Sequence, residues 1–545
     1  MYESGRIRTL WELVEYRAAA SADSVMFYEP DGRTVTFGEA RERALRAAAG
    51  FRELGIGAGT RVAWQLPTRV STVLASLALA RLGAVQIPIV HLHREREVGY
   101  VLAASEAEFV LVPGVWRDVD FTAMARKAAP DGTRVVTVRG GAGLPDGDPA
   151  GLPEFAPGHA RERASSHERE HTSWIYYTSG TTADPKGVRH TDASLIAGGV
   201  GLATALEMSA ADIGSIAFPY AHIAGPDYVI AMLVSGFPAV VLETFAPGAA
   251  ADTYARLGVT MAGGSTAFYQ AFLEESRRRA DDGKRRADDD KRCADGGKLR
   301  RAHGGKLIPS LRLLSGGGAP LPPELYFEAG RELECEVLHG YGMTECPMIA
   351  MGTPYDTDEQ LSRTVGRPVA GAEVRIAGPD GRALPAGEPG EVTLKGPMVC
   401  QGYTDPALTA AAFDADGWFH TGDLGFLRAD GHLVLTGRLK DIIIRKGENI
   451  SAQEVEDLVR GHPAVADAAV IGLPDRERGE RVCAVVTLAD PGGSALTLGE
   501  LADHLRRAGL MTQKLPEQLE IAAELPRGGP LGKVLKGALR EWYAD

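Results

Sequence analysis

Hydrophobic and polar positions follow two different periods along the first 400 or so residues of the chain. Helical spacing covers Glu39 to Leu54 and Ser71 to Leu82, and short apolar runs follow at Arg61 to Leu66 and Val85 to Val90. Helices that alternate with short β-rich runs are typical of doubly wound, mostly parallel sheets. The pattern therefore predicts a large α/β N-terminal domain built on doubly wound sheets.

The pattern changes beyond Gly366. Short strands separated by Gly and Pro turns, such as Ala372 to Ile376 and Gly390 to Leu394, predict a small β-barrel or antiparallel sheet. After Arg438 helices and strands mix less regularly, and Thr497 opens a capping box ahead of a helix. These features predict a small α+β C-terminal domain.

We predict three parts, namely an N-terminal domain (1–437), a hinge (438–441) and a mobile C-terminal domain (442–545). One stretch of the N-terminal domain, 277–306, repeats Arg, Lys, Asp and Gly in a degenerate seven-residue pattern. It cannot bury enough apolar surface to offset its ordering entropy, so we expect a low-complexity, mobile surface insertion. A functional basic patch is the alternative, which the interleaved Asp residues weaken.

Charge and cysteine content narrow the class of protein. The chain carries 59 basic and 72 acidic residues, a formal net charge of −13, which argues against a nucleic-acid partner. Five scattered cysteines without C-x-x-C spacing disfavour a disulfide framework or a zinc site and fit a reducing cytoplasm. The apolar stretches 70–90 and 228–242 are interrupted by charged, Gly or Pro residues, so we expect buried helices and strands rather than a transmembrane segment.

The most informative run lies between Tyr177 and Val188, directly after an apolar strand-like stretch. Hydroxyls and backbone N–H groups on a tight loop can cradle phosphate oxygens, and a lysine supplies the compensating charge. The run differs from the usual P-loop, whose lysine stands beside the last glycine and before a Ser or Thr. A plain linker is the alternative. The candidate phosphate-binding residues are Thr178, Ser179, Gly180, Thr181, Thr182 and Lys186.

Four further motifs follow in order, at His339–Glu345, Trp418–Asp423, Gly437–Asp441 and Pro530–Lys533. Together with the hydroxyl-rich run they resemble the adenylate-forming superfamily, which includes acyl-CoA synthetases, luciferases and the adenylation domains of peptide synthetases. The resemblance covers nearly the whole chain. It implies an ATP-dependent acid–CoA ligase that joins a carboxylic acid to AMP, releases pyrophosphate and then forms a CoA thioester. ATP, Mg²⁺ and CoA are the implied cofactors.

The resemblance also implies a role for each motif. Tyr341 would stack on adenine, although core packing is the alternative for a lone tyrosine. Thr344 would bind the α-phosphate, and Glu345 would hold Mg²⁺ through a carboxylate oxygen. Asp423 and Arg438 would bind the ribose, although Asp423 could be only a turn residue. The remaining residues of the implied adenine site are Gly317, Ala319, Pro320, His339, Gly340 and Gly342.

Lys533 is the implied catalytic residue for adenylation, because its ammonium would bridge the acid and the α-phosphate. One departure from the family pattern is that five residues, rather than four, separate the Leu-Pro-Arg run from Lys533. For thioester formation the resemblance implies that the C-terminal domain swings about Lys440. Lys446 and Gly447 would then line the path of the pantetheine arm. A solvated linker is the alternative for the hinge.

The sequence says least about the identity of the carboxylic acid substrate. By resemblance His222 lies beside the carboxylate and completes the catalytic set with Lys533, Thr344 and Glu345, although a lone histidine is more often a core residue. The candidate pocket residues are small or apolar and predict a roomy, uncharged cavity. They are Gly264, Thr266, Gly317 and Met343. The stretch from Ile87 to Glu97 resembles the branch of the family that acts on medium-chain, alicyclic or aromatic acids. Asp227 is out of register with the family's amino-acid-binding carboxylate, which disfavours an amino-acid substrate.

Two alternatives to a CoA ligase remain open. One is an acyl-AMP ligase that delivers to a carrier protein, although no carrier domain follows in this sequence. The other is a non-catalytic nucleotide-binding regulator, which would be expected to have lost Lys533, Glu345 or Asp423, and all three are present. The expected partners are a small carboxylic acid and CoA, and a homodimer is left open.

Overall fold

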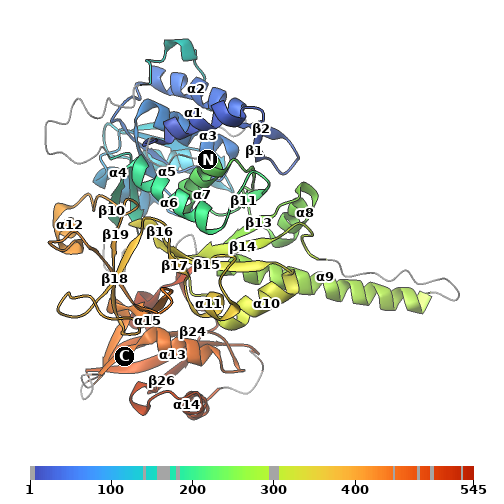
Figure 1. Cartoon of the computed structure of the whole chain (residues 1–545), viewed down its shortest axis with the longest axis vertical. Helices are drawn as coiled ribbons and strands as arrows, with labels where there is room; N and C mark the ends of the chain where they lie inside the picture. Colours follow the sequence, from blue (N-terminus) through green and yellow to red (C-terminus); the bar gives the residue numbers. More distant parts are fainter. Residues whose placement is uncertain are drawn as a thin grey trace. The chain divides into compact units, whose positions relative to one another are not determined.

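The computed structural model of the chain (Figure 1) describes residues 7–138, 143–155, 172–178, 185–293, 306–445, 448–475, 479–490, 492, 496–528 and 532–544. The chain divides into two compact units. The N-terminal unit contains Met1–Ala372 and Gly396–Ala412, and the C-terminal unit contains Glu373–Lys395 and Phe413–Asp545. We describe each unit by itself.

Two sheets of the N-terminal unit confirm the predicted doubly wound architecture. In the larger sheet five strands are parallel and β10 joins the edge antiparallel, in the order β10 (Lys186–His190), β9 (Trp174–Thr178), β4 (Val85–Pro88), β3 (Arg61–Trp64), β5 (Phe109–Val112) and β8 (Arg134–Thr137). The smaller sheet runs β11 (Gly214–Ile216), β12 (Ala239–Val241), β1 (Val25–Tyr28) and β2 (Thr34–Thr36). A short hairpin joins β6 (Val115–Trp116) to β7 (Val119–Asp120).

Helices cover these sheets where the sequence pattern predicted them. Thr36 caps α2 with a capping box to Glu39, and the helix buries its alanine-rich face. The apolar helix α3 is buried on nearly all sides and ends at Gly83, whose φ of 69° suits glycine. No helix of the described residues is long and apolar enough to cross a membrane. The helices before the third sheet are α1 (Leu10–Ser21), α2 (Phe37–Glu53), α3 (Val70–Leu82), α4 (Glu95–Ala104), α5 (Phe121–Ala128), α6 (Asp192–Ala205), α7 (Ala224–Ser235) and α8 (Pro247–Leu257).

A third sheet of the N-terminal unit carries several predicted motifs. Its first three strands are parallel, and the last two complete it in antiparallel orientation. Aromatic and aliphatic side chains, including Tyr269 and Phe272, fill the core between this sheet and its helices. The strands are β13 (Met261–Gly264), β14 (Leu313–Gly317), β15 (Glu336–Met343), β16 (Cys346–Met351) and β17 (Arg367–Pro368), and the helices are α9 (Thr266–Cys293), α10 (Pro323–Leu333), α11 (Asp358–Arg363) and α12 (Pro406–Ala412).

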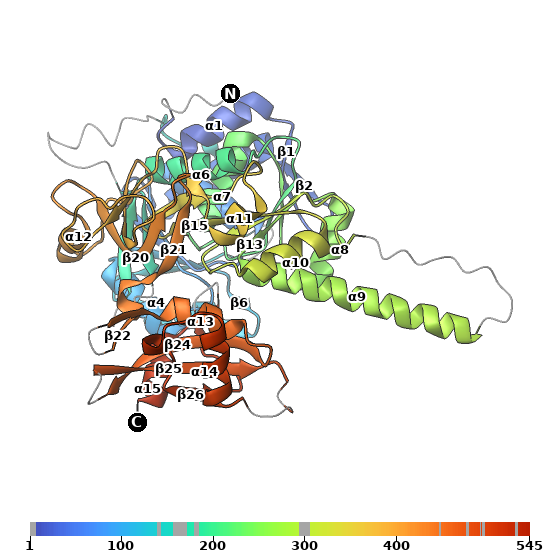
Figure 2. The same cartoon turned by 60° about the horizontal axis from the view of Figure 1, so that its bottom comes forward.

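Helix α9 extends through the first part of the segment predicted to be an insertion, and both views show it projecting outward beyond α10 (Figures 1 and 2). Arg277 binds Glu328 and Glu332 of α10 at 2.7 and 2.9 Å. Arg279 binds Glu275 one turn earlier in α9 at 2.6 Å. The first turns of α9 bury Tyr269, Phe272 and Leu273, and beyond them charge pairs support the helix, which explains why the hydrophobic pattern did not indicate this part. Residues 294–305 lie outside the described residues.

The C-terminal unit contains two main sheets and confirms the predicted strands after Gly366. One is the antiparallel sheet β18 (Glu373–Ala377), β19 (Gly390–Lys395), β20 (Phe419–Leu427) and β21 (Leu433–Arg438). The other contains β22 (Ile442–Arg445), β23 (Glu448–Ser451), β24 (Val465–Asp475), β25 (Gly479–Leu488) and β26 (Gln518–Ile521). Helices α13 (Ala452–Arg460) and α14 (Leu498–Arg507) pack on one face of the β24–β25 pair, and α15 (Lys536–Tyr543) packs on the other (Figure 2).

Candidate active site

The hydroxyl-rich run is the connection of a β-hairpin in the N-terminal unit. Strands β9 and β10 pair antiparallel in unbroken register, from Trp174 opposite His190 to Thr178 opposite Lys186. The first hydroxyl residue of the predicted phosphate loop and its lysine are therefore neighbours across the mouth of the hairpin. The loop residues between them, Ser179, Gly180, Thr181 and Thr182, lie outside the described residues.

Thr344 and Glu345 form the turn between β15 and β16, since Met343 pairs with Cys346. Two contacts hold the backbone of this turn. His190 Nε2 lies 2.7 Å from the carbonyl oxygen of Thr344, and the amide of Cys400 donates to the carbonyl oxygen of Glu345 at 2.8 Å. The turn is thus bound to β10 and to the segment 400–404.

Tyr403, in the same segment, connects the predicted phosphate lysine with the predicted metal ligand. Its hydroxyl donates to Glu345 Oε1 at 2.8 Å, and Lys186 Nζ lies 5.5 Å from the centre of its ring. A cation at this distance is attracted by the ring quadrupole. Burial and the adjacent Glu345 carboxylate raise the pKa of Tyr403, so the phenol keeps its proton and remains a donor.

His190 is a buried support of the turn. The carbonyl of Thr344 can only accept, so Nε2 carries the ring proton, and Nδ1 then accepts from the Ser194 hydroxyl at 2.9 Å. Burial lowers the pKa of His190 to about 4, which keeps the imidazole neutral at pH 7. A neutral histidine with both nitrogens engaged positions Thr344 and leaves no nitrogen for ligand binding.

The predicted pocket residues come from the carboxyl ends of three adjacent parallel strands. Gly264 ends β13, Gly317 ends β14 and Met343 ends β15, while Thr266 begins α9 directly after β13. In open α/β sheets ligands bind outside the carboxyl ends of the strands. The sheet therefore gathers these four residues at one edge, the edge that also carries Thr344 and Glu345.

The glycines around Tyr341 are required by the hairpin itself. A Cβ on Gly340 would lie 2.3 Å from Met351 Sδ, and a Cβ on Gly342 would lie 2.2 Å from the carbonyl oxygen of Pro347. Both positions therefore exclude side chains so that β15 and β16 can pack closely. Tyr341 itself is 7% exposed. Close packing therefore accounts for both glycines, with no need for a bound nucleotide. The binding of adenine by Tyr341 stays a prediction.

His339 lies on β15 opposite Gly316 of β14 and is buried. Burial lowers the pKa of His339 to about 4, and the backbone of Ala319 opposes this shift, so the ring is neutral at pH 7. Its Nδ1 makes no hydrogen bond to any described residue. The role of His339 in adenine binding stays a prediction.

The segment before α7 carries His222. The Thr68 hydroxyl donates to the Phe218 carbonyl and accepts from the Tyr220 amide, both at 3.0 Å, which fixes the backbone ahead of His222. Nδ1 of His222 accepts from the Ala224 amide at 3.3 Å. The half-buried imidazole is therefore held at the N-terminus of α7.

In the C-terminal unit the structure brings Asp423 and Arg438 together. The two residues are register partners in β20 and β21, and Arg438 Nε lies 2.8 Å from Asp423 Oδ1. Asp423 is only 5% exposed, and Glu391 of β19 supports the preceding turn by accepting from the Gly422 amide at 3.0 Å. The predicted ribose-binding pair is thus preassembled.

Lys533 lies exposed on a two-stranded hairpin whose base is tightly fixed. Strands β27 (Arg527–Gly528) and β28 (Lys533–Val534) place Gly528 opposite Lys533. Arg527 donates to the carbonyl of Gly532 at 2.7 Å and forms an ion pair with Asp467 of β24. The strand pair thus forms in spite of the extra residue before Lys533.

Of the three residues predicted for the swing and the CoA path, only the backbone of Lys440 belongs to the described residues. The hinge contains the 3-10 helix η2 (Leu439–Asp441), which includes the backbone of Lys440. Lys446 and Gly447 lie outside the described residues. Arg540 of α15 reaches Asp441 at 3.3 Å, so the helix that follows Lys533 contacts the predicted hinge.

Comparison with known proteins supplies the family. The AMP-binding enzyme family matches residues 14–404, and the AMP-binding enzyme C-terminal domain matches residues 454–530. The chain belongs to the AMP-binding enzyme family. This confirms the resemblance that the motifs indicated.

Relatives of this AMP-binding enzyme span nearly its whole length. A 2-hydroxy-7-methoxy-5-methyl-1-naphthoate–CoA ligase from Streptomyces carzinostaticus is 32% identical, covering 93% of this chain and 88% of that protein. A salicyl-AMP ligase/salicyl-S-ArCP synthetase from Mycobacterium tuberculosis is 32% identical, covering 93% and 85%. The solved o-succinylbenzoate coenzyme A synthetase from Bacillus subtilis, in complex with ATP and magnesium ion, has a TM-score of 0.77, 27% identity and coverage of 97% and 99%. The expected class, an AMP-forming acyl-CoA synthetase that uses ATP, Mg²⁺ and CoA, is confirmed.

The donor set at Glu345 fits Mg²⁺. Among the described residues no group of three or more His, Cys, Asp or Glu could hold a metal ion by protein ligands alone. Mg²⁺ in nucleotide enzymes keeps several waters and binds through one or two carboxylates plus substrate phosphates. A single carboxylate oriented by Tyr403 suits that mode.

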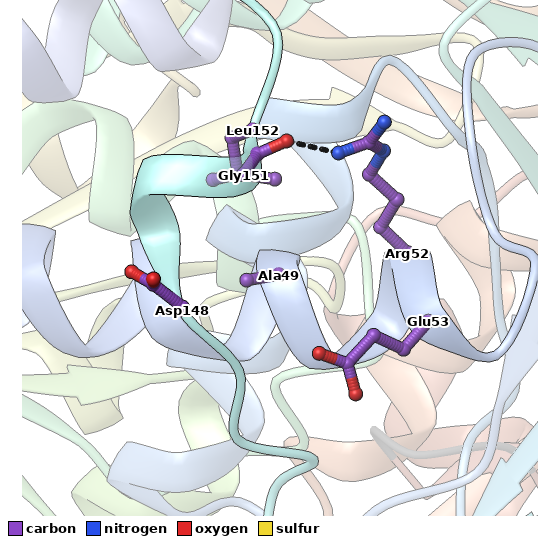
Figure 3. A pocket seen from close by; sticks show the side chains of 6 residues that line it. All are labelled: Ala49, Arg52, Glu53, Asp148, Gly151 and Leu152. Carbon is purple, nitrogen blue, oxygen red and sulfur yellow. Dashed lines mark hydrogen bonds between the residues drawn. The ribbon is translucent and has the colours of Figure 1, made fainter.

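One pocket of this AMP-binding enzyme lies apart from the predicted site residues. It has a volume of about 290 Å³, lies between α2 and the 3-10 helix η1 (Pro149–Gly151), and contains a hydrogen bond from Arg52 to the Gly151 carbonyl (Figure 3). None of the residues predicted for catalysis or binding lines it. It is lined by Ala49, Arg52, Glu53, Asp148, Gly151 and Leu152.

Sequence reasoning missed three supporting residues of this AMP-binding enzyme, His190, Tyr403 and Arg527. His190 and Tyr403 contact the Thr344–Glu345 turn from distant segments, so no local pattern could reveal those contacts. Arg527 lies five residues before the Gly532 carbonyl that it binds. His190 offered no clear signal, because the run from Lys186 to His190 contains only one apolar side chain, Val188.

Proposed function

We propose that this AMP-binding enzyme activates a carboxylic acid as acyl-AMP and transfers the acyl group to CoA. The observation that carries the proposal is the meeting of β10, the Thr344–Glu345 turn and Tyr403. This arrangement places a lysine and a preoriented carboxylate at the mouth of a hydroxyl-rich loop. Both are needed to bind a nucleoside triphosphate and its Mg²⁺.

In the proposed adenylation step the acid carboxylate attacks the α-phosphorus of ATP and pyrophosphate leaves. Lys186 and the hydroxyls of 178–182 hold the β- and γ-phosphates, and Thr344 binds the α-phosphate. Lys533 neutralises the charge that builds as the two anions meet. Glu345 would hold Mg²⁺, which when bound would supply charge stabilisation for the phosphates. No covalent enzyme intermediate is needed.

For the nucleoside we propose that Tyr341 and the Gly317–Pro320 segment enclose adenine, and that Asp423 with Arg438 binds the ribose. In the second step CoA thiolate attacks the acyl carbon and AMP leaves. We propose that residues 438–441 are the hinge, with Lys440 at its centre, about which 442–545 swings. Lys446 and Gly447 would line the CoA path.

The proposed acid is medium-chain, alicyclic or aromatic. Gly264, Gly317 and Met343 are small or apolar and come from one sheet edge, and a Cβ added to Gly264 would lie 3.1 Å from the ring of Phe218, four residues before His222. A relative that acts on a naphthoate supports a bulky acid. We further propose a cytoplasmic enzyme, from the scattered cysteines, and a homodimer.

A carrier-protein acceptor is the second candidate, because a relative of similar identity is named a salicyl-S-ArCP synthetase. The test is a panel of carboxylic acids assayed for pyrophosphate release with and without CoA, with thioester detected by mass. We expect pyrophosphate release with a bulky acid and acyl-CoA only when CoA is added. Acyl-AMP that accumulates in the presence of CoA would favour the carrier-protein alternative, and no release with any acid would contradict ligase activity.

A further inference from the structure

The carboxylate predicted to bind ribose, that of Asp423, lies on an irregular part of β20. The register pairs on either side are Glu391 with Leu424 and Thr393 with His420. Between these pairs β19 advances by two residues and β20 by four, so β20 bulges there, with β21 along its other edge (Figure 2). A bulge re-aims the side chains that it contains. The direction of the Asp423 carboxylate therefore depends on the groups that hold the bulge.

Glu391 of β19 holds the bulge with both oxygens of its carboxylate. Oε1 accepts from the Gly422 amide at 3.0 Å, and Oε2 lies 2.7 Å from His420 Nδ1. An ionised carboxylate can only accept, so His420 Nδ1 carries a proton and donates it. The side chain of Glu391 is 18% exposed, which shields both bonds from most of the solvent. Glu391 thus joins the beginning of the bulge to its centre.

Two further features fix the backbone that leads to Asp423. The Thr421 hydroxyl donates to the Val392 carbonyl at 2.7 Å and accepts from the Asp423 amide at 3.0 Å. Gly422 has a φ of 72°, and a Cβ added there would meet no atom within 4 Å, so its conformation rather than lack of space requires glycine. The backbone of Asp423 is therefore tied to β19 through the two residues before it.

The side chain of Asp423 has a weaker constraint on its other side. Arg438 of β21 reaches Oδ1 at 2.8 Å, but the arginine side chain is 43% exposed. An ion pair to a half-exposed arginine contributes little by itself. A carboxylate that must accept from ribose hydroxyls needs a geometry held within about 0.5 Å. The contacts that hold the bulge therefore carry most of this orientation.

We propose that Glu391 is a positioning residue for ribose recognition. Through the bulge it fixes the direction of the Asp423 carboxylate, so that the enzyme distinguishes ATP from 2′-deoxy-ATP and 3′-deoxy-ATP. The inference rests on the proposed function and deepens its nucleoside site. Glu391 acts through Asp423 and contacts no reacting atom, and His420 is its partner in holding the bulge.

The test measures kcat and KM for pyrophosphate release with ATP and with the two deoxy analogues. For the wild type we expect kcat/KM to fall by about 10- to 100-fold for each missing hydroxyl, the range for a hydrogen bond to a charged group. Glu391→Ala should raise KM for ATP by about tenfold, with kcat within about threefold, because ground-state binding is lost. The penalty for a missing hydroxyl should fall below about threefold, because a misdirected carboxylate gains little from the hydroxyls.

Glu391→Gln is the conservative variant that should rescue the discrimination. Its amide oxygen can accept from the Gly422 amide, and its N–H can donate to His420 Nδ1 once the ring proton moves to Nε2. Because both bonds are kept, we expect a penalty within about threefold of that of the wild type. A loss as large as that of Glu391→Ala would show that the two bonds do not carry the effect and would contradict the inference.

Glu517→Ala is the matched control, from the other main sheet of the C-terminal unit. Its carboxylate likewise joins a side chain to a backbone amide, since it accepts from Arg445 Nε at 2.9 Å and from the Val482 amide at 3.2 Å. The loss of these bonds should lower the Tm. The ratio of kcat/KM between ATP and each deoxy analogue should stay as in the wild type.

Binding of AMP gives a readout that needs no turnover. Calorimetric titration of the wild type with AMP, 2′-deoxy-AMP and 3′-deoxy-AMP should show AMP binding about 10- to 100-fold more tightly than either analogue. Glu391→Ala should bring the three Kd values within about threefold of one another. If Glu391→Ala does not fold, His420→Leu, which removes one of the two bonds, should lower the penalty by at least about threefold, and an unchanged penalty would overturn the inference.

The outcomes separate this inference from the ligase proposal. If Glu391→Ala lowers kcat or the Tm while the penalty for each missing hydroxyl stays as in the wild type, Glu391 is only structural and the inference is wrong. A wild type that accepts the deoxy nucleotides as well as ATP would overturn it too. If the AMP series follows the expected order but no acid gives pyrophosphate release, the ligase proposal fails and the inference about Glu391 stands.

Discussion

The two charged residues most important to the proposed chemistry, Glu345 and Lys533, have opposite surroundings. Glu345 is 7% exposed, lies on a two-residue turn and is fixed by Tyr403 and the Cys400 amide. Lys533 is exposed on a short hairpin, and the contacts that fix its surroundings act at the hairpin base through Arg527.

The comparison shows that the burial of Glu345 and the exposure of Lys533 each follow from the proposed chemical role of the residue. A metal ligand must hold one geometry, so its carboxylate benefits from a rigid, partly desolvated setting with an orienting donor. A lysine that must approach the substrate in one step and leave in the next cannot be buried. Desolvation would lower the pKa of its ammonium group, and packed neighbours would prevent the side chain from moving. We therefore expect substitutions at Glu345 and its partners to affect binding, and those around Lys533 to affect rate.

The largest effect is expected for Lys533→Ala. Loss of one preorganised charge donor typically lowers the rate by about 10²–10³, so acyl-AMP formation should fall by that factor. Thioester formation from preformed acyl-AMP and CoA should stay near the wild-type rate. Single-turnover assays of each half-reaction measure the split, with Lys514→Ala, a surface lysine paired with Glu454, as control. Equal loss in both halves would contradict the role of Lys533.

The buried support of the fixed turn should make stability depend on pH. The pKa of His190 is lowered by burial to about 4, below the usual 6.5, so the unfolded chain binds more protons between these values. Above pH 6.5 the buried neutral His190 should not lower the free energy of unfolding. As the pH drops toward 4, the free energy of unfolding should fall by up to about 3 kcal/mol. Denaturant unfolding of wild type and His190→Gln across this range tests it. If the free energy of unfolding of the variant depends on pH as steeply as that of the wild type, His190 is not the cause. The similarly buried His339 contributes to the pH dependence in the same direction.

Tyr403→Phe should weaken the orientation of Glu345 without removing the carboxylate. Loss of a partner that orients a metal ligand typically costs about 10–100-fold in metal affinity or activity. We expect the Mg²⁺ concentration for half-maximal pyrophosphate release to rise by about that factor while saturating activity recovers. The matched control is Tyr355→Phe, because that tyrosine is 79% exposed and far less constrained. A lower rate that Mg²⁺ does not restore would indicate a different role for Tyr403.

The smallest effect is expected at the base of the Lys533 hairpin. Arg527→Ala removes the hydrogen bond to the Gly532 carbonyl, and Asp467→Asn weakens the pair that orients Arg527. Because these groups are half-exposed, we expect only about a tenfold loss in kcat for acyl-AMP formation, with KM for ATP nearly unchanged. Arg506→Ala, on the surface of α14, should change neither constant. A rise in KM alone would argue against a positioning role.

Periodicity, turns and capping predicted the main elements. The helix predicted from Ser71 to Leu82 is α3, the capping box at Thr497 opens α14, and the strands after Gly366 form the antiparallel sheet. The ordered motifs indicated the family. The continuation of α9 through Arg277 was missed, since beyond the buried Tyr269, Phe272 and Leu273 its support comes from ion pairs with α10.

By itself the sequence determined which residue types are present and in which local setting, because turn chemistry, periodicity and motif spacing depend on neighbours along the chain. Only the tertiary structure decided that His190 and Tyr403 support the Thr344–Glu345 turn, that Arg527 braces the hairpin of Lys533, and that Glu391 holds the bulge that carries Asp423. Apart from the local bond from Arg527 to Gly532, those facts depend on contacts between segments distant in sequence and on exclusion of water. Neither is encoded in any single stretch of residues.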